Sequence, residues 1–325
     1  MAAIETVRGT IDSSDLGRVL MHEHVFVLSP EVMDNYDTGW DEETRVADAI
    51  ARLTALKENG ISTIVDLTVL GLGRFMPRIQ RVAAAVDINI VVATGLYTYN
   101  EIPHYFHFRG PGLMFEGPEV MIDMFVNDIE VGIAGTGVKA AILKCATDEP
   151  GMTHGVERVL RAVAKAHRLT GVPITTHTHA GTRRGLEQQD IFDSEGVDLS
   201  QVVIGHCGDS TDVDYLVEVL KRGSFIGMDR FGIDTILPFE DRIQSVVSLV
   251  EKGFSNQIVL SHDAACFNDW LPAEQLPIIT PQWHYQHILR DVVPALLQRG
   301  VSQEQIDQML IHNPRRIFER AKVAY

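Results

Sequence analysis

The stretch that decides the fold is residues 19–24, Val19-Leu20-Met21-His22-Glu23-His24, a short apolar run that ends in two histidines one residue apart. In an extended strand successive side chains alternate between faces, so His22 and His24 point to one side and Glu23 points to the other. Two imidazoles with this spacing at a strand end can hold one metal ion. The same pair is also compatible with two solvated or hydrogen-bonded histidines, so the positions of the other ligand-type residues decide between the two interpretations.

Seven further apolar runs of strand length follow along the chain. They are residues 62–67, 88–93, 139–144, 173–177, 201–206, 224–229 and 257–263. Amphipathic segments of helical spacing fit between these runs, and Gly171 is placed to end one of them. Strands that alternate with helices predict a parallel sheet with right-handed crossovers, and eight is the number that closes a barrel. We therefore expect an α/β protein, a (β/α)8 TIM barrel built as a single domain over residues 1–325, with an open doubly wound sheet as the alternative.

The composition limits the partners and the compartment of the protein. A net charge of −16 and a pI near 5.2 argue against nucleic acid or an anionic membrane as a partner. No apolar run approaches the roughly 20 residues that span a bilayer, and residues 1–8 lack the apolar core of a signal peptide. The 3 cysteines are an odd number in a long chain, which argues against a disulfide framework. We expect a cytoplasmic protein.

Polar side chains gather near the carboxyl ends of the predicted strands. They are His22, His24, Asp66, Lys144, His177, His206, Asp229, Arg230 and Asp263. The carboxyl ends of barrel strands form one face, where the catalytic groups of this fold lie. Strand ends are polar wherever they meet water, but that does not explain several histidines, a lysine and an aspartate on one rim. The sequence therefore predicts a metal site at this rim.

The number of ligands predicts two metals rather than one. Four imidazoles and the Asp263 carboxylate exceed the three protein ligands that a single catalytic zinc ion normally takes. A pair of ions roughly 3.5–4 Å apart uses all of them but needs a bridging anion. Lys144 supplies one if burial keeps its amine neutral and carbon dioxide converts it to a carbamate. A buried Lys144 paired with Asp263 is the alternative.

This series of residues resembles the phosphotriesterase family of the amidohydrolase superfamily, and the resemblance covers nearly the whole chain. The segments that carry it are Met21-His22-Glu23-His24, Thr94-Gly95-Leu96-Tyr97, Ile142-Leu143-Lys144, Ile204-Gly205-His206, Met228-Asp229-Arg230 and Ser261-His262-Asp263. The resemblance implies that His22, His24 and Asp263 hold one divalent metal, that His177 and His206 hold the other, and that carboxylated Lys144 bridges them. Zinc is the expected metal, with cobalt, manganese or iron as alternatives. His179 could take the role of His177 or support it from outside.

Within the family, Tyr97 and Arg230 resemble the lactonase branch, because phosphotriester hydrolases tend to carry tryptophan at the position of Tyr97. The resemblance gives both residues, and Asp263, catalytic roles. The alternatives are that Tyr97 only packs under an aromatic loop and that Arg230 only pairs with a carboxylate. The resemblance also places Cys266 and Trp270 in a substrate channel, although Cys266 could be a small buried hydrophobe and Trp270 a loop anchor.

The activity that the resemblance implies is hydrolysis of a small-molecule lactone, above all an N-acyl homoserine lactone, by hydroxide held between the two metals. Asp263 would accept the proton and Tyr97 would orient the carbonyl or the leaving oxygen. Organophosphate triester hydrolysis as the main activity is the first alternative, and a non-catalytic metal-binding barrel is the second. By the same resemblance we expect a homodimer.

Overall fold

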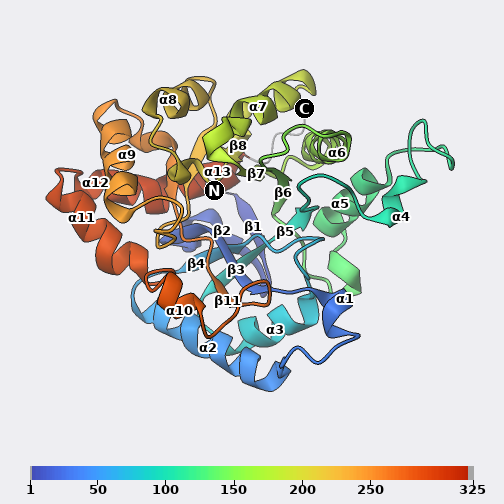
Figure 1. The fold of residues 1–325 in the computed structure, drawn as a ribbon, viewed down its shortest axis with the longest axis horizontal. Coiled ribbons are helices and arrows are strands. Elements are labelled where there is room, and N and C mark those ends of the chain that lie inside the picture. The colour runs from blue at the N-terminus through green and yellow to red at the C-terminus, as the bar shows by residue number, and fades with distance from the viewer. Residues whose placement is uncertain (1, 321–325) are drawn as a thin grey trace.

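The computed structural model describes residues 2–320, so residues 1 and 321–325 of the predicted domain lie outside the described chain. Nine parallel strands form one sheet in the order β10-β9-β8-β7-β6-β5-β4-β3-β11. The strands lie at the centre of the molecule (Figure 1). The strands are β3 (Val19–Val27), β4 (Thr63–Asp66), β5 (Asn89–Gly95), β6 (Ile142–Thr147), β7 (Ile174–Thr178), β8 (Val202–Ile204), β9 (Phe225–Met228), β10 (Ile258–Leu260) and β11 (Ala265–Asn268). The segment from β10 to β11 closes the barrel on β3, because the Asp263 N–H donates to the His22 carbonyl at 3.0 Å and the His24 N–H donates to the Ala264 carbonyl at 2.8 Å. The predicted (β/α)8 barrel is confirmed.

The helices surround the strands, as Figure 1 shows. They are α1 (Pro30–Met33), α2 (Glu42–Glu58), α3 (Met76–Ala85), α4 (His104–His107), α5 (Val120–Glu130), α6 (His154–Thr170), α7 (Arg184–Ser194), α8 (Val213–Lys221), α9 (Phe239–Glu251), α10 (Leu276–Ile279), α11 (Val293–Gln298), α12 (Gln303–Asp307) and α13 (Asn313–Arg320). The short helices α1, α4 and α10 lie in the loops that follow β3, β5 and β11. No helix of residues 2–320 is long and apolar enough to cross a membrane.

Strand side chains alternate between two cores. Val65, Val91 and Val203 belong to the inner core, whereas their neighbours Ile64 and Ile90 pack in the outer core beneath the helices. Strand β3 departs from this alternation, because its register against β4 shifts between Leu20 and Glu23. Bulges of this kind re-aim side chains beside active sites. Met21 stays in the inner core, and its neighbour His22 points to the rim on the same side of the strand instead of to the opposite side.

Three features differ from the sequence-based expectation. The sheet has a ninth strand, β11, beyond the eight that were predicted. An antiparallel hairpin of β1 (Ala3–Thr6) and β2 (Gly9–Asp12) precedes the barrel and was not predicted. The fourth barrel strand runs from Ile142 to Thr147 rather than over residues 139–144, because the Ala140 N–H is engaged by the Asp128 carbonyl before the strand begins. Lys144 therefore lies in the middle of its strand, opposite Gly95, where a Cβ would approach the Lys144 carbonyl oxygen to 1.9 Å.

Candidate metal centre and active-site cavity

The six predicted metal ligands converge at the carboxyl end of the barrel. Oδ1 of Asp263 lies 3.2 Å from His24 Nε2 and 3.3 Å from His22 Nε2. Lys144 Nζ lies 3.1 Å from the same His22 nitrogen, and His206 Nε2 lies 3.7 Å from Asp263 Oδ2. The ring centroid of His177 is 4.4 Å from that of His206. The structure thus brings together residues from β3, β6 and β7 with residues that follow β8 and β10.

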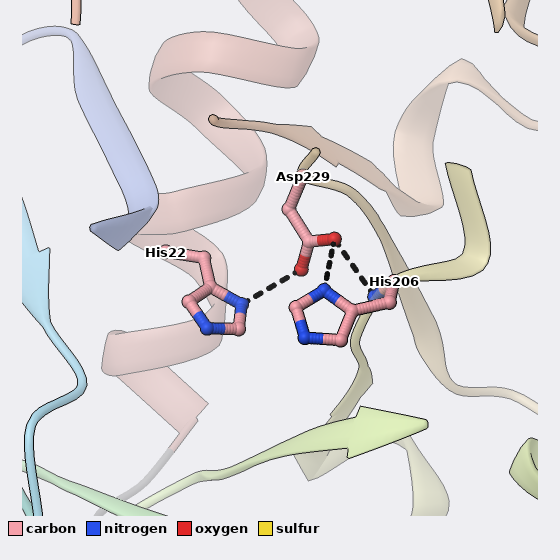
Figure 2. Close-up of side chains that lie close together, drawn as sticks. All are labelled: His22, His206 and Asp229. Carbon is pink, nitrogen blue, oxygen red and sulfur yellow. Dashed lines mark hydrogen bonds and ion pairs between the residues drawn. The ribbon is translucent and has the colours of Figure 1, made fainter. Parts of the chain in front are cut away.

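One carboxylate orients a histidine from each predicted metal pair. Asp229 lies directly after β9, and its two oxygens bond to Nδ1 of His22 at 2.9 Å and Nδ1 of His206 at 3.0 Å (Figure 2). The His206 backbone N–H also donates to Asp229 at 2.7 Å. Asp229 therefore meets the outer nitrogens and leaves the Nε2 lone pairs free to bind a metal. We assign it an orienting role, although its position would also fit a ligand group with the two histidines.

The other two histidines are oriented in the same way by different partners. His24 Nδ1 lies 2.9 Å from the Thr68 hydroxyl, which donates to Asp66 at 2.6 Å and so accepts the histidine proton. His177 Nε2 bonds to Asp148, which leaves its Nδ1 facing the site. Each of the four imidazoles thus has an acceptor on its outer nitrogen, which is the arrangement that fixes metal-ligating histidines.

The electrostatics of the site suit a divalent cation. Burial lowers the pKa of His22 and of His206, and lowers that of His177 to about 4, so these three imidazoles are neutral and able to ligate. Burial also lowers the pKa of Lys144 to about 8. Burial raises the pKa of Asp263, but its close contacts with His22 and His206, the hydrogen bond from His24 and the charged Arg230 guanidinium outweigh it and hold that pKa well below its usual range. Neutral nitrogen donors around an anionic carboxylate are the donor set that zinc and similar ions prefer.

Arg230 connects Asp263 to a second carboxylate, that of Asp209. Its Nε donates to Asp263 at 3.0 Å and its Nη1 donates to Asp209 at 3.0 Å. Asp209 also accepts from Arg242 at 2.6 Å. A guanidinium does not give up its proton in proteins, so Arg230 holds Asp263 in place and anionic rather than accepting a proton from it.

A cavity of about 380 Å³ opens above the candidate ligands. Tyr97 lies in its wall, with its hydroxyl 3.1 Å from His177 Nδ1 and 2.6 Å from the Tyr99 hydroxyl. Trp270 also lines the cavity and packs obliquely on Tyr97, with ring centroids 6.2 Å apart. The remaining walls are mainly apolar, with side chains from the loop after β9 and from the segment around α10. They include Leu72, Ile233, Ile236, Leu271, Leu276 and Ile279.

Cys266 is not where the substrate-channel interpretation put it, and the structure places His179, which was an alternative to His177, outside the converging ligands. Cys266 is not among the residues that line this cavity; it is buried in the outer core, with its Sγ 3.3 Å from the Tyr285 hydroxyl. The reason is the alternation of β11, in which Ala265 takes the cavity-facing position. His179 bonds to Thr182 at 2.9 Å, away from the converging ligands, and the site histidine of this strand is His177.

Several residues of the site were missed by the sequence analysis. They are Thr68, Tyr99, Asp148 and Asp209, together with the orienting role of Asp66 and Asp229. Asp148 was within reach, because it follows the last residue of β6, but the predicted strand ended three positions too early. Asp209 lies in a short turn after His206, and its contact with Arg230 spans 21 residues.

Comparisons with known proteins agree with this geometry. The sequence profile of the phosphotriesterase family matches residues 2–318. The "Phosphotriesterase homology protein" of Mycobacterium tuberculosis is 64% identical over 321 residues, which cover 98% of each chain. The solved structure of the phosphotriesterase from Mycobacterium tuberculosis superposes with a TM-score of 0.97 at 64% identity, and the match covers 98% of this chain and 99% of that one.

Two more distant matches have names that refer to organophosphate hydrolysis and to lactone hydrolysis. An "Aryldialkylphosphatase" of Saccharolobus solfataricus is 39% identical over 313 residues, 96% of this chain and 98% of its own. A solved structure described as organophosphate hydrolysis activity engineered from a weak promiscuous lactonase template superposes with a TM-score of 0.87 at 31% identity, covering 98% of this chain and 100% of that one.

Proposed function

The chain belongs to the phosphotriesterase family of metal-dependent hydrolases, and on that premise we propose that it hydrolyses lactones, with N-acyl homoserine lactones as the preferred class. The observation that carries this proposal is the pairing of one polar reaction centre with one largely apolar cavity. Tyr97, Arg230 and Asp263 stand beside the converged histidines, and apolar side chains line the space above them. A lactone with an acyl tail has this same division between a polar ring and an apolar chain.

The residues that would hold the metals are those named by the resemblance. His22, His24 and Asp263 would hold one ion, and His177 and His206 the other, with Lys144 as a carbamate between them. Two such ions polarise a carbonyl oxygen and lower the pKa of water, which makes a nucleophile at neutral pH. The buried Lys144 amine, with its pKa lowered to about 8, supports the carbamate because carbon dioxide adds to a neutral amine.

The chain's own residues then provide proton transfer and orientation. Attack of water on the planar lactone carbonyl forms a C–O bond and a tetrahedral centre, and Asp263 accepts the proton that water loses. The Tyr97 hydroxyl, which burial keeps protonated by raising its pKa, donates a hydrogen bond to the developing oxygen. When the ring C–O bond breaks, the proton passes from Asp263 to the departing alkoxide. Arg230 stabilises the carboxylate form of Asp263 between turnovers.

The rival substrate class is the organophosphate triester, which the name of the Saccharolobus relative specifies for that protein. A triester starts tetrahedral and carries three substituents around phosphorus. The apolar lining here comes mainly from the loops after β9 and β11, which suits a tail that leaves the reacting group on one side. We therefore propose triester hydrolysis as a side activity.

The test compares kcat/KM for a long-chain N-acyl homoserine lactone and for a diethyl aryl phosphate triester on the same metal-loaded protein. We expect the lactone to be favoured by more than about tenfold, which corresponds to about 1.4 kcal/mol in transition-state stabilisation. A larger kcat/KM for the triester would replace the lactonase proposal with the phosphotriesterase one. If the fully metal-loaded protein turned over neither substrate, the result would favour a non-catalytic barrel.

A further inference from the structure

Glu23 stands between the candidate ligands His22 and His24 in the sequence, but its buried side chain points away from them. It has no exposed surface, and four donors surround its carboxylate. Oε1 accepts from the Ser261 hydroxyl at 2.9 Å, from the His262 N–H at 3.0 Å and from His262 Nδ1 at 2.7 Å. Oε2 accepts from the Ala264 N–H at 3.0 Å. Glu23 thus binds the residues on both sides of Asp263.

The backbone at Asp263 requires such support. Its φ is +55°, in the left-handed region that non-glycine residues rarely adopt, and this kink turns the carboxylate toward His22 and His24. Backbone hydrogen bonds join the same two segments, from Asp263 to the His22 carbonyl and from His24 to the Ala264 carbonyl. The kink is therefore held from strand β3 on both sides.

The hydrogen-bond directions show that Glu23 acts only as an acceptor. His262 Nε2 accepts the Ile288 backbone N–H at 2.9 Å, so the imidazole proton is on Nδ1 and is donated to Glu23. The Ser261 hydroxyl accepts the His22 N–H at 2.9 Å, so its own proton is free for Glu23. Both oxygens of the side chain must be acceptors for all four bonds to form.

We propose that Glu23 is a positioning residue that fixes Asp263 against His22 and His24 and thereby forms one of the two metal sites. The proposal rests on the proposed ligation and is independent of the substrate. Glu23 reaches no ligand of the other predicted ion directly, so its effect is specific to the site of His22, His24 and Asp263. If Glu23 merely stabilised the barrel, its replacement would weaken both metal sites together or neither.

The variant Glu23→Gln separates these possibilities with minimal change in shape. Its amide oxygen keeps the bonds at Oε1. Its NH2 group faces the Ala264 N–H, so two donors oppose each other and that hydrogen bond is lost. The matched control is Asp128→Asn, which removes a carboxylate that pairs with Arg74 at 2.7 Å and Thr94 at 2.6 Å away from the cavity lining. Ser261→Ala removes one donor to Glu23 and serves as the milder variant if Glu23→Gln does not fold.

The first measurement is metal affinity, by titration of zinc-free protein with Zn²⁺ against a competing chelator. We expect wild type and Asp128→Asn to bind two ions alike, and Glu23→Gln to keep one affinity while the other falls at least tenfold. Ser261→Ala should shift the same site by less. Equal weakening of both sites in Glu23→Gln, or no change in either, would overturn the proposal.

The second measurement needs no metal. Amide hydrogen exchange over residues 262–264 of the metal-free protein should accelerate at least tenfold in Glu23→Gln and stay at the wild-type rate in Asp128→Asn. Unchanged exchange in Glu23→Gln would refute the role of Glu23 even if metal binding fell. Fewer than two ions in wild type would refute the proposed ligation instead, and exchange would still decide whether Glu23 holds the Asp263 kink.

Discussion

The hydroxyl of Tyr97 lies 3.1 Å from Nδ1 of His177, the one site histidine whose inner nitrogen meets a phenol. This places an O–H donor at the junction between the candidate metal centre and the cavity. Because the predicted ligand atom of His177 is that same nitrogen, a substrate oxygen bound nearby would be within reach of the phenol.

Removal of this hydroxyl should therefore affect lactones selectively. We expect Tyr97→Phe to lower kcat for an acyl homoserine lactone about tenfold, a loss of about 1.4 kcal/mol, and to change triester hydrolysis less. Tyr99→Phe, which removes the neighbouring hydroxyl, is the control and should cost less than Tyr97→Phe. Steady-state kinetics on both substrates check this, and equal losses on the two would argue that Tyr97 only packs.

Lys144 should be necessary for metal retention. We expect Lys144→Ala to lose metal, because β6 carries no carboxylate that could bridge in its place, and to regain part of it when a short carboxylic acid is added with the metal. Elemental analysis after chelator-free purification provides the measurement. Wild-type metal content in Lys144→Ala would show that this lysine does not bridge.

The carboxylates Asp229 and Asp148, which orient the histidines, should differ in which metal ions they affect. Asp229 contacts one histidine of each predicted pair, so Asp229→Asn should weaken both metals, by about 10- to 100-fold. Asp148→Asn should weaken mainly the ion held by His177, because Asp148 contacts that histidine alone among the predicted ligands. Chelator competition on each variant separates the two patterns. The same pattern in both variants would contradict the assignment of ligands to two sites.

Trp270 should set the preference for acyl length. We expect Trp270→Ala to lower kcat/KM for long-chain substrates while short-chain ones change little, since each buried CH₂ contributes about 0.8 kcal/mol. Leu169→Ala, at a residue 63% exposed and outside the cavity lining, is the control. A series of acyl lengths measured on both variants tests the expectation, and a uniform loss across the series would remove Trp270 from the channel.

Cys266 should matter for stability rather than selectivity. Its side chain is 4% exposed in the outer core, so Cys266→Ala should lower the free energy of unfolding by about 1 kcal/mol. The acyl-length profile should stay as in wild type. Denaturant unfolding and the same substrate series measure both. A changed profile would show that the cysteine reaches the substrate after all.

The sequence was informative where a residue's role follows from its place at a strand end. His22, His177, His206 and Asp263 could be found in this way because parallel strands of a barrel bring their carboxyl ends to one rim. The bulge in β3 could not be found, because it depends on register against β4 and leaves no pattern in residues 19–24. The orienting acceptors were also hidden, since their role arises from contacts such as that between Asp209 and Arg230 across two loops.

Cys266 shows why an error of one residue matters. The predicted substrate channel at Cys266 and Trp270 placed the correct segment beside the cavity, but the left-handed Asp263, between β10 and β11, resets the alternation of side chains before β11 begins. Ala265 then faces inward and Cys266 outward. Backbone conformation at a single position therefore decided a side-chain assignment that composition and spacing left open.

The closure of the barrel has a consequence for how the protein matures. The bond between His24 and Asp263 joins residues 239 positions apart, so this part of the candidate centre comes together only after most of the chain has been synthesised. Contacts of such long range form late, because the chain entropy they cost must be offset by structure already in place. A nascent chain that stops before Ser261 has the first pair of histidines without its carboxylate. Metal ions would therefore bind tightly at this site only in the completed barrel, and a growing chain would not bind them tightly there.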